Sequence, residues 1–356
     1  MKKILQDLTY GELETLAEEY GEPRFRADQI RRGLTAGDRI SAISGLPKSF
    51  RAKLLERFED EPVRIAERYV SSDGTEKYLY ALADGNVVEG VLMSYKYGRT
   101  QCVSTQVGCR MGCVFCASGL NGLIRNLTAG EILAQVLCVN RLAGGTPEKR
   151  AVTNLVLMGS GEPLDNYEQT VRFLRLATSP GGIGVSARNI SLSTCGLVPR
   201  MRDLAEENLP VNLTVSLHSP FDGERAELMP AAKAYSIREI LDACSYYFDR
   251  TGRRYIFEYS LIAGRNADRA HAEALVSLLR GRPCHVNLIR LNEVKERGLA
   301  GTGEKEAYRF LGVLQKSGLS ATLRRQIGAD IGGACGQLRA GRLKELSEKG
   351  EGNDGG

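Results

Sequence analysis

The sequence lacks several features that would place it in a common class of protein. No apolar run approaches the roughly 20 residues that a membrane-spanning helix needs, and the start, MKKILQDLTYGELE, has no signal-peptide core. The nine cysteines are an odd number, which argues against a complete disulfide framework. These absences exclude membrane proteins and disulfide-stapled secreted proteins, and they predict a cytoplasmic protein with reduced thiols and no membrane partner.

Length and charge set wider limits. The 356 residues are enough for a large core and a small accessory domain, and 42% hydrophobic with 26% charged residues is ordinary for a soluble protein. The net charge is only +5, but residues 23–57 hold nine basic residues against three acidic ones. Such a stretch suits contacts with phosphate groups. On charge alone, a solvated helical face is an equally good interpretation.

Three cysteines carry the most specific signal. Cys109, Cys113 and Cys116 form C-x-x-x-C-x-x-C within VGCRMGCVFCASG. Three thiolates at this spacing fit three irons of a [4Fe-4S] cluster and leave the fourth iron open for a substrate. A zinc site is the alternative, but zinc motifs usually need four ligands, and here no second C-x-x-C pair follows and the nearest histidine is His218. The spacing resembles the signature of the radical S-adenosylmethionine superfamily, so we expect the open iron to chelate S-adenosylmethionine.

The hydrophobic pattern changes twice along the chain. Residues 1–60 repeat at helical spacing, and residues 61–100 form short apolar runs separated by the turn pairs Asp73-Gly74 and Asp84-Gly85. Residues 101–340 alternate strand and helix, with strands expected at 102–107, 154–158, 189–194, 211–217, 255–262 and 285–291, and a last one at 321–326. The pattern predicts an α/β fold, a partial (β/α)6 barrel with a helical N-terminal domain and a β-hairpin region. The remaining tail, 341–356, is expected to end in disorder.

Several helix starts are legible. Thr128 with Glu131, and Ser236 with Glu239, have the spacing of capping boxes. Asn166 and Asn266 are expected to cap two more helices.

Polar residues gather where the expected strands end. Because reacting groups of parallel barrels lie at the carboxyl ends of the strands, these residues point to one shared site. Taken singly, each serine is better explained by turn chemistry, and His218 is nearly as well explained as a core histidine. Together they predict a cofactor-binding set: Gly161, Glu162, Ser193, Ser216, Leu217, His218 and Asn292.

Two further thiols stand apart from the cluster motif. Cys102 lies on the first expected barrel strand, and Cys335 lies among glycines in GGACG. A cysteine in a glycine-rich loop is unlike a core residue, and it suits a mobile nucleophile. Cys138, Cys244 and Cys284 lie in apolar segments and are expected in the core.

The whole pattern resembles the RlmN/Cfr family of radical S-adenosylmethionine RNA methyltransferases. The resemblance covers about residues 10–340 and includes FRADQI, CVSTQVGCRMGCVFCAS, RNLTAGEI, MGSGEPLDN, STCG, VNLTVSLHSP, RRYIFEYSLIAG, CHVNLI and DIGGACGQL. It implies that Cys109, Cys113 and Cys116 hold the cluster and that two S-adenosylmethionine molecules are used per turnover. One would methylate Cys335, and the second would generate a radical that activates this methyl group.

The resemblance also implies the later steps. The activated methyl group would add to carbon 2 of an adenosine in ribosomal RNA or in certain transfer RNAs. Glu89 would act as the proton acceptor, and Cys102 would form a transient disulfide with Cys335 to release the product. A flavodoxin-type electron donor and a monomeric protein are expected on the same ground.

Some residues depart from the family pattern and keep alternatives open. Gly332-Gly333 replaces a common Asp-Ala before Cys335, and Arg290 replaces a common proline. HVNLIR and SLHSP also occur in Cfr, which methylates carbon 8 of adenosine in ribosomal RNA and so confers antibiotic resistance. A carbon-8 enzyme is therefore one alternative, and a non-catalytic iron–sulfur RNA-binding protein is another.

Overall fold

The barrel is the largest feature of the protein. The structure is a computed structural model that describes residues 2–292 and 297–331, so Gly332, Gly333, Cys335 and the tail 341–356 lie outside the described residues. Within them, a ten-stranded sheet has the order β1-β2-β3-β4-β7-β8-β9-β10-β11-β12. Its strands are β1 (Val63–Val70), β2 (Glu76–Leu82), β3 (Val87–Tyr95), β4 (Gly98–Cys102), β7 (Asn154–Leu157), β8 (Ile190–Thr194), β9 (Asn212–Ser216), β10 (Tyr255–Leu261), β11 (Cys284–Arg290) and β12 (Ala321–Leu323).

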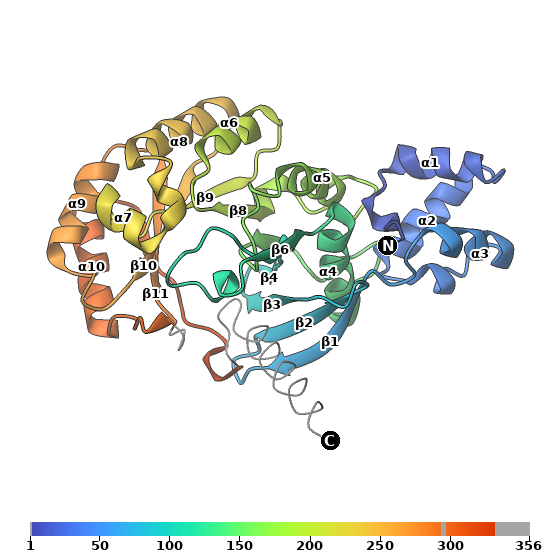
Figure 1. Cartoon of the computed structure of the whole chain (residues 1–356), viewed down its shortest axis with the longest axis horizontal. Helices are drawn as coiled ribbons and strands as arrows, with labels where there is room; N and C mark the ends of the chain where they lie inside the picture. The colour runs from blue at the N-terminus through green and yellow to red at the C-terminus, as the bar shows by residue number, and fades with distance from the viewer. Residues whose placement is uncertain (1, 293–296, 332–356) are drawn as a thin grey trace, which may run out of the picture.

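The sheet has an antiparallel part and a parallel part. Strands β1 to β4 are antiparallel neighbours, and every pairing from β4 through β12 is parallel. The sheet ends at β1 and β12 without pairing them, so the barrel is partial. Helices follow the parallel strands as predicted: α4 (Ala129–Leu142), α5 (Tyr167–Thr178), α6 (Val198–Glu206), α7 (Asp222–Leu228), α8 (Ile237–Thr251), α9 (Arg269–Leu279) and α10 (Glu304–Lys316). The predicted α/β partial barrel is confirmed (Figure 1).

The first barrel strand differs from the prediction. It was expected at 102–107, but β4 ends at Cys102, and β5 (Gln106–Gly108) pairs instead with β6 (Leu123–Asn126) in a separate two-stranded sheet. Past Cys102, backbone hydrogen bonds continue on the β7 side, from the Val103 N–H to Val156 and from the Thr105 N–H to Ser160, but side chains replace the ladder on the β3 side. The backbone N–H of Ser104 donates to the Gln135 side chain at 3.0 Å, and the Ser104 hydroxyl donates to the Glu89 carbonyl at 2.7 Å. A sequence pattern cannot reveal hydrogen-bond partners that lie so far apart in the chain.

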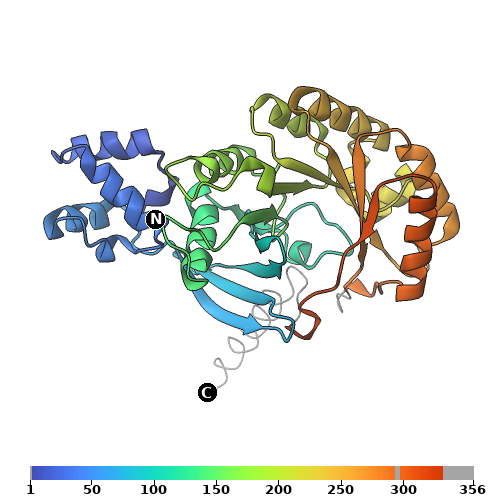
Figure 2. The same cartoon turned by 180° about the vertical axis from the view of Figure 1, so that it is seen from behind.

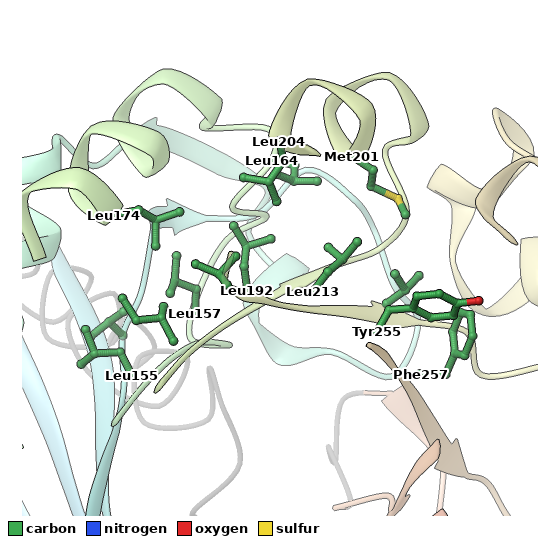
Figure 3. Close-up of a cluster of buried hydrophobic side chains, with 14 of the residues drawn as sticks. Leu155, Leu157, Leu164, Leu174, Leu192, Met201, Leu204, Leu213, Tyr255 and Phe257 are labelled. Carbon is green, nitrogen blue, oxygen red and sulfur yellow. The ribbon is translucent and has the colours of Figure 1, made fainter. Parts of the chain in front are cut away.

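The main core lies between the sheet and its helices. Strand alternation sends Leu155, Leu157, Leu192 and Leu213 toward the helices, where they are buried with residues such as Leu174 of α5 (Figure 3). The opposite face of the same strands lines the inside of the barrel. Polar residues are therefore tolerated there, and the site described below is built on that face.

The N-terminal helices form a separate group at one end of the molecule (Figure 1). They are α1 (Tyr10–Glu19), α2 (Phe25–Thr35) and α3 (Lys48–Arg57), and their apolar faces bury a cluster of their own. Polar contacts join them to the barrel: the Asp7 carboxylate accepts from the Gly130 N–H at the start of α4, and Arg31 donates to the Gly181 carbonyl. The division of the chain at residues 60, 100 and 340 stays a prediction.

The basic stretch is largely neutralised. Six of its nine cations form ion pairs: Arg24–Glu18, Arg26–Glu22, Arg31–Asp28, Arg32–Glu148, Arg39–Glu61 and Arg57–Glu19. Five of these six partners lie outside residues 23–57, so the count over that window overstated the local charge. The structure favours the solvated helical face over a phosphate-binding patch.

Two of the four expected helix caps are as predicted. The capping boxes Thr128–Glu131 and Ser236–Glu239 are both formed. Asn166 occupies the N-cap of α5, but its side chain donates to the Thr105 and Leu127 carbonyls instead of capping. The prediction for Asn266 was wrong. The cap of α9 is Asp268, whose carboxylate is two residues closer to the helix.

The segment after β12 returns to the N-terminal strands of the sheet. Residues 324–331 run from β12 toward the turn between β1 and β2, where the Gly328 N–H donates to the Asp73 carboxylate at 2.9 Å (Figure 2). Ser71 in the same turn donates to Asp330. This segment covers part of the open side of the barrel. Among the described residues, no helix is both long enough and apolar enough to span a bilayer.

Candidate active site

Two adjoining cavities occupy the inside of the barrel. The first, which we name the cysteine-loop cavity, is lined among others by Cys109, Cys113 and Cys116 and measures about 180 Å³. The second, the Cys102 cavity, measures about 240 Å³. Both share the lining residues Phe115, Cys116, Met158 and Glu258. Neither alone reaches the roughly 300 Å³ typical of small ligand sites, whereas the joined space does.

The three motif cysteines sit on the loop that follows β5. Gly108 ends that strand with φ +82°, and a Cβ there would lie 2.0 Å from the Gly122 carbonyl oxygen. Glycine is therefore required for the two ends of the loop to approach, and the Cys109 N–H donates to the same carbonyl at 3.0 Å. The loop thus brings all three cysteines to the lining of one cavity, and their role as cluster ligands stays a prediction.

The thiols are chemically suited to a metal cluster. Burial raises the pKa of Cys109 to about 12 and raises the pKa of Cys113 further, with smaller contributions from the neighbouring cysteines. Such thiols ionise readily only if a positive centre replaces the lost solvation. In the described chain, no three His, Cys, Asp or Glu side chains surround a single metal-ion position. A cluster does not require the three cysteines to surround one metal position, because each cysteine binds a different iron.

Glu162 lies beside the cysteines on the loop after β7. Its carboxylate accepts from the Leu164 N–H at 3.0 Å and from the Cys195 N–H at 2.8 Å, while burial raises its pKa. Gly161 before it has φ +110°, and a Cβ there would lie 2.7 Å from Gln106 Cβ. The glycine thus lets the loop pass close to β5 and aim the carboxylate into the cavity.

His218 is a buried histidine bonded to backbone that also lines the cavity, and its contact with a cofactor stays a prediction. Its Nδ1 accepts from the Ser260 N–H at 2.9 Å, so the proton resides on Nε2. Burial lowers its pKa to about 3, which keeps the ring neutral. His218 has φ +59° and its carbonyl accepts from Asn266, which explains the true role of that asparagine. The ring also lines the cysteine-loop cavity, edge-on to Phe115.

The other expected cofactor residues do not all line the same cavity. Ser193 and Ser216 line the cysteine-loop cavity together with Gly161, Glu162 and His218. The Leu217 side chain is fully buried in the main core, so only its backbone is available to a ligand. Asn292 lines the Cys102 cavity instead, where its side-chain oxygen is 3.4 Å from the Gln326 amide nitrogen.

Cys102 and Glu89 lie on neighbouring strands. Cys102 ends β4, is buried, and lines the cavity that bears its name. Alternation along β3 puts Glu89 on the same face as Val91 and Met93, which line that cavity. Its carboxylate is 3.2 Å from Lys77 Nζ, and the two side chains are 4% and 0% exposed. No disulfide joins two of the described cysteines, and the relation of Cys102 to Cys335 stays a prediction.

Sequence reasoning missed three charged residues of this region. Arg225 of α7 donates to the Cys195 and Ser216 carbonyls at 2.6 and 3.1 Å, and so joins the ends of β8 and β9. Burial lowers its pKa. Lys77 and Glu258 reach the barrel interior from β2 and β10. For Lys77 and Glu258, the available signal was a charged residue within an otherwise apolar strand, in EKYLYAL and YIFEYSL.

Comparison with known proteins agrees with this site. Residues 103–278 match the Radical SAM superfamily, whose members use a [4Fe-4S] cluster and S-adenosylmethionine. A "probable dual-specificity RNA methyltransferase RlmN" of Clostridium botulinum is 47% identical over 99% of this chain and 100% of its own length, and a Lachnospira eligens protein of the same description is 44% identical over 99% of each.

A solved structure adds the fold. The crystal structure of a radical SAM methyltransferase from Sphaerobacter thermophilus superposes with a TM-score of 0.90 at 44% identity, covering 94% of this chain and 98% of that one. The match covers nearly the whole length of both chains. The chain therefore belongs to the RlmN family of radical S-adenosylmethionine RNA methyltransferases.

Proposed function

We propose that this protein methylates carbon 2 of adenosine in ribosomal RNA and in transfer RNA. One observation carries the proposal: the Cys102 thiol lines a cavity that adjoins the cysteine loop and shares Phe115, Cys116 and Met158 with it. A plain methyl transfer needs no second thiol. A thiol beside the cluster loop, but not in its motif, suits a route through a methylated cysteine. The relatives' description as dual-specificity RNA methyltransferases supports both RNA classes.

The cysteine-loop cavity would hold the cofactors. Cys109, Cys113 and Cys116 would bind the [4Fe-4S] cluster, and the cluster with S-adenosylmethionine would supply a 5′-deoxyadenosyl radical. Glu162 has lone pairs for the amino group of the methionine part, and Ser193, Ser216 and the Nε2–H of His218 offer further hydrogen bonds. Asn292 would reach the ligand from the neighbouring cavity.

The Cys102 cavity would receive the RNA base. Cys335 would carry the methyl group, with two S-adenosylmethionine molecules used per turnover, and Cys102 would attack its sulfur to release the product as a transient disulfide forms. Glu89 would accept the carbon-2 proton from its place beside Lys77. A base can enter only if it leaves its stack, which is how enzymes generally reach base atoms in RNA.

The electron donor, the location and the association state are proposed from the family resemblance. A flavodoxin-type donor would supply the electron, and the protein would act in the cytoplasm as a monomer. Because most of the basic N-terminal stretch is ion-paired, we do not assign the phosphate contacts to it.

The test is product analysis. The protein with its cluster is incubated with ribosomal and transfer RNA, and the RNA is digested to nucleosides and analysed by chromatography and mass spectrometry. 2-Methyladenosine in both RNAs is expected. 8-Methyladenosine would instead support the Cfr-type alternative, and no product despite S-adenosylmethionine binding would support a non-catalytic RNA-binding protein.

Thiol variants test the route. Cys102→Ala and Cys335→Ala should abolish the product with the iron content unchanged. Cys138→Ala is the matched control, because this thiol lies on α4 and donates to the Gln135 carbonyl away from both cavities. Full turnover by either of the first two variants would refute the two-thiol route.

A further inference from the structure

Glu258 occupies the wall between the two cavities. It lies in the middle of β10, in register with Ser216 of β9 and Asn287 of β11. Its neighbours Phe257 and Tyr259 point outward into the main core, so strand alternation turns Glu258 inward. It lines both the cysteine-loop cavity and the Cys102 cavity. No other carboxylate among the described residues lines both.

One oxygen of this carboxylate lacks a partner. Glu258 is 8% exposed, and its Oε1 is buried without a hydrogen bond to any group in residues 2–292 or 297–331. Burial raises the pKa of Glu258, while the charge of Arg324 and a hydrogen bond with Asn287 act in the opposite direction. A buried acceptor without a donor is rare in proteins, and a donor from outside the chain, a water or a ligand, would complete it.

The surroundings indicate the shape of that ligand. Val91, Met93, Phe115 and Met158 give the Cys102 cavity apolar walls, and Cys102 lies on the same surface. The cysteine-loop cavity, in contrast, is also lined by the hydroxyl-bearing residues Ser193, Ser216 and Ser260. The lining of the Cys102 cavity also includes the polar or charged residues Thr75, Arg290, Asn292, Arg324, Arg325 and Gln326. Apolar walls together with a buried acceptor fit a flat heterocycle that carries an N–H group at one edge.

We propose that Glu258 accepts a hydrogen bond from the exocyclic 6-amino group of the adenine that is methylated. This inference rests on the proposed function, because it assumes that an RNA base enters the Cys102 cavity. The interaction would select adenine over guanine, since the 6-oxo group of guanine would bring a second acceptor against the carboxylate. Glu258 is thus a specificity-determining residue for the RNA substrate.

The test removes each partner in turn. The substrates are two RNAs, one with the target adenosine and one with a purine ribonucleoside there, which lacks only the amino group. The proteins are wild type, Glu258→Met, which keeps the length without an acceptor, and Glu258→Gln, which keeps a carbonyl acceptor. Glu258→Leu replaces Glu258→Met if that variant loses its fold or its iron. The quantity compared is kcat/KM for methylation.

Loss of the amino group should lower kcat/KM of the wild type about tenfold to a hundredfold. Glu258→Met should lose a similar factor on adenosine, and it should discriminate less than about threefold between the two RNAs, because the interaction is already gone. Glu258→Gln should restore part of the discrimination. S-Adenosylmethionine affinity without RNA should be unchanged in all variants.

Two results would overturn the proposal. The first is discrimination by Glu258→Met equal to that of the wild type. The second is a tenfold or greater loss of S-adenosylmethionine affinity in Glu258→Met without RNA, which would assign the carboxylate to the cofactor. Absence of methylation of adenosine RNA by the wild type would contradict the proposed function itself, and is seen before any variant is compared.

Discussion

Gly161→Ala is the most informative single perturbation of the site. Gly161 has φ +110°, which alanine adopts only with strain, and the new Cβ would lie 2.7 Å from Gln106 Cβ and 2.8 Å from Gln106 N. Real Cβ atoms do not approach that closely, and a backbone nitrogen cannot swing away. The substitution must therefore displace either β5, which leads into the cysteine loop, or the segment that carries Glu162.

The magnitude follows from two terms. A strained backbone conformation costs about 1–3 kcal/mol, and inserting a methyl group into a packed site costs about 1–3 kcal/mol. We expect a loss of about 2–6 kcal/mol of unfolding free energy, a large part of the 5–15 kcal/mol typical of a folded protein. The Glu162 N–H bond to the Gln106 side chain, 2.8 Å long, should weaken with it.

Gly312→Ala is the matched control. Gly312 lies inside helix α10, and a Cβ there would meet nothing within 4 Å. Because glycine weakens a helix interior, this variant should gain about 0.5–1 kcal/mol. Urea unfolding followed by far-UV circular dichroism measures both changes, and the chain has no tryptophan for fluorescence. Isothermal titration of S-adenosylmethionine should show weaker binding only in Gly161→Ala.

The reasoning would be refuted if Gly161→Ala unfolded within about 0.5 kcal/mol of the wild type, the range expected of surface substitutions. Equal losses in Gly161→Ala and Gly312→Ala would be as damaging, since the argument depends on local geometry and not on glycine as such.

Two further predictions concern ion pairs, one buried and one with exposed carboxylates. Lys77→Met leaves the Glu89 carboxylate without its 3.2 Å partner and should lower the free energy of unfolding in urea by about 3–5 kcal/mol. Adding Glu89→Leu should restore most of this loss. A double variant whose loss equals the sum of the two single losses would contradict the prediction. Burial lowers the pKa of His271, but hydrogen bonds to Asp268 and Glu224 outweigh it and raise the pKa above 6.5. The stabilisation is therefore complete below pH 6.5 and is lost as the pH rises through the raised folded-state value, so His271→Gln should flatten the pH dependence of the unfolding midpoint in that window; an unchanged slope would exclude this group.

Local features were predictable from the residues because their causes are local. The close spacing of Cys109, Cys113 and Cys116 brings all three to one cavity, because they share a short loop flanked by glycines. The capping boxes at Thr128 and Ser236 formed because both partners lie within one helical turn. The alternation of strands and helices likewise sufficed for the partial barrel, because each unit buries its own apolar face.

Distant contacts decided what local patterns left open. The first barrel strand ends at Cys102, and not five residues later: beyond it a side chain from α4 takes the place of the ladder on the β3 side, while backbone bonds persist on the β7 side. Asn266 lies in a signal for a helix start, yet the structure uses it to hold the His218 backbone. The basic stretch loses its excess charge to glutamates that the chain brings in from elsewhere.

The C-x-x-x-C-x-x-C motif could be read from spacing, whereas the cavity partners of that loop could not. Glu258 is one glutamate in an apolar strand, and nothing near it in the sequence shows that its oxygen Oε1 is buried without a partner between two cavities. Register across β9, β10 and β11 puts it there. Hydrogen bonding within a loop or a turn depends on residues that are adjacent in the sequence. The solvation of a buried charge depends on every strand around it, and only the folded barrel brings those strands together.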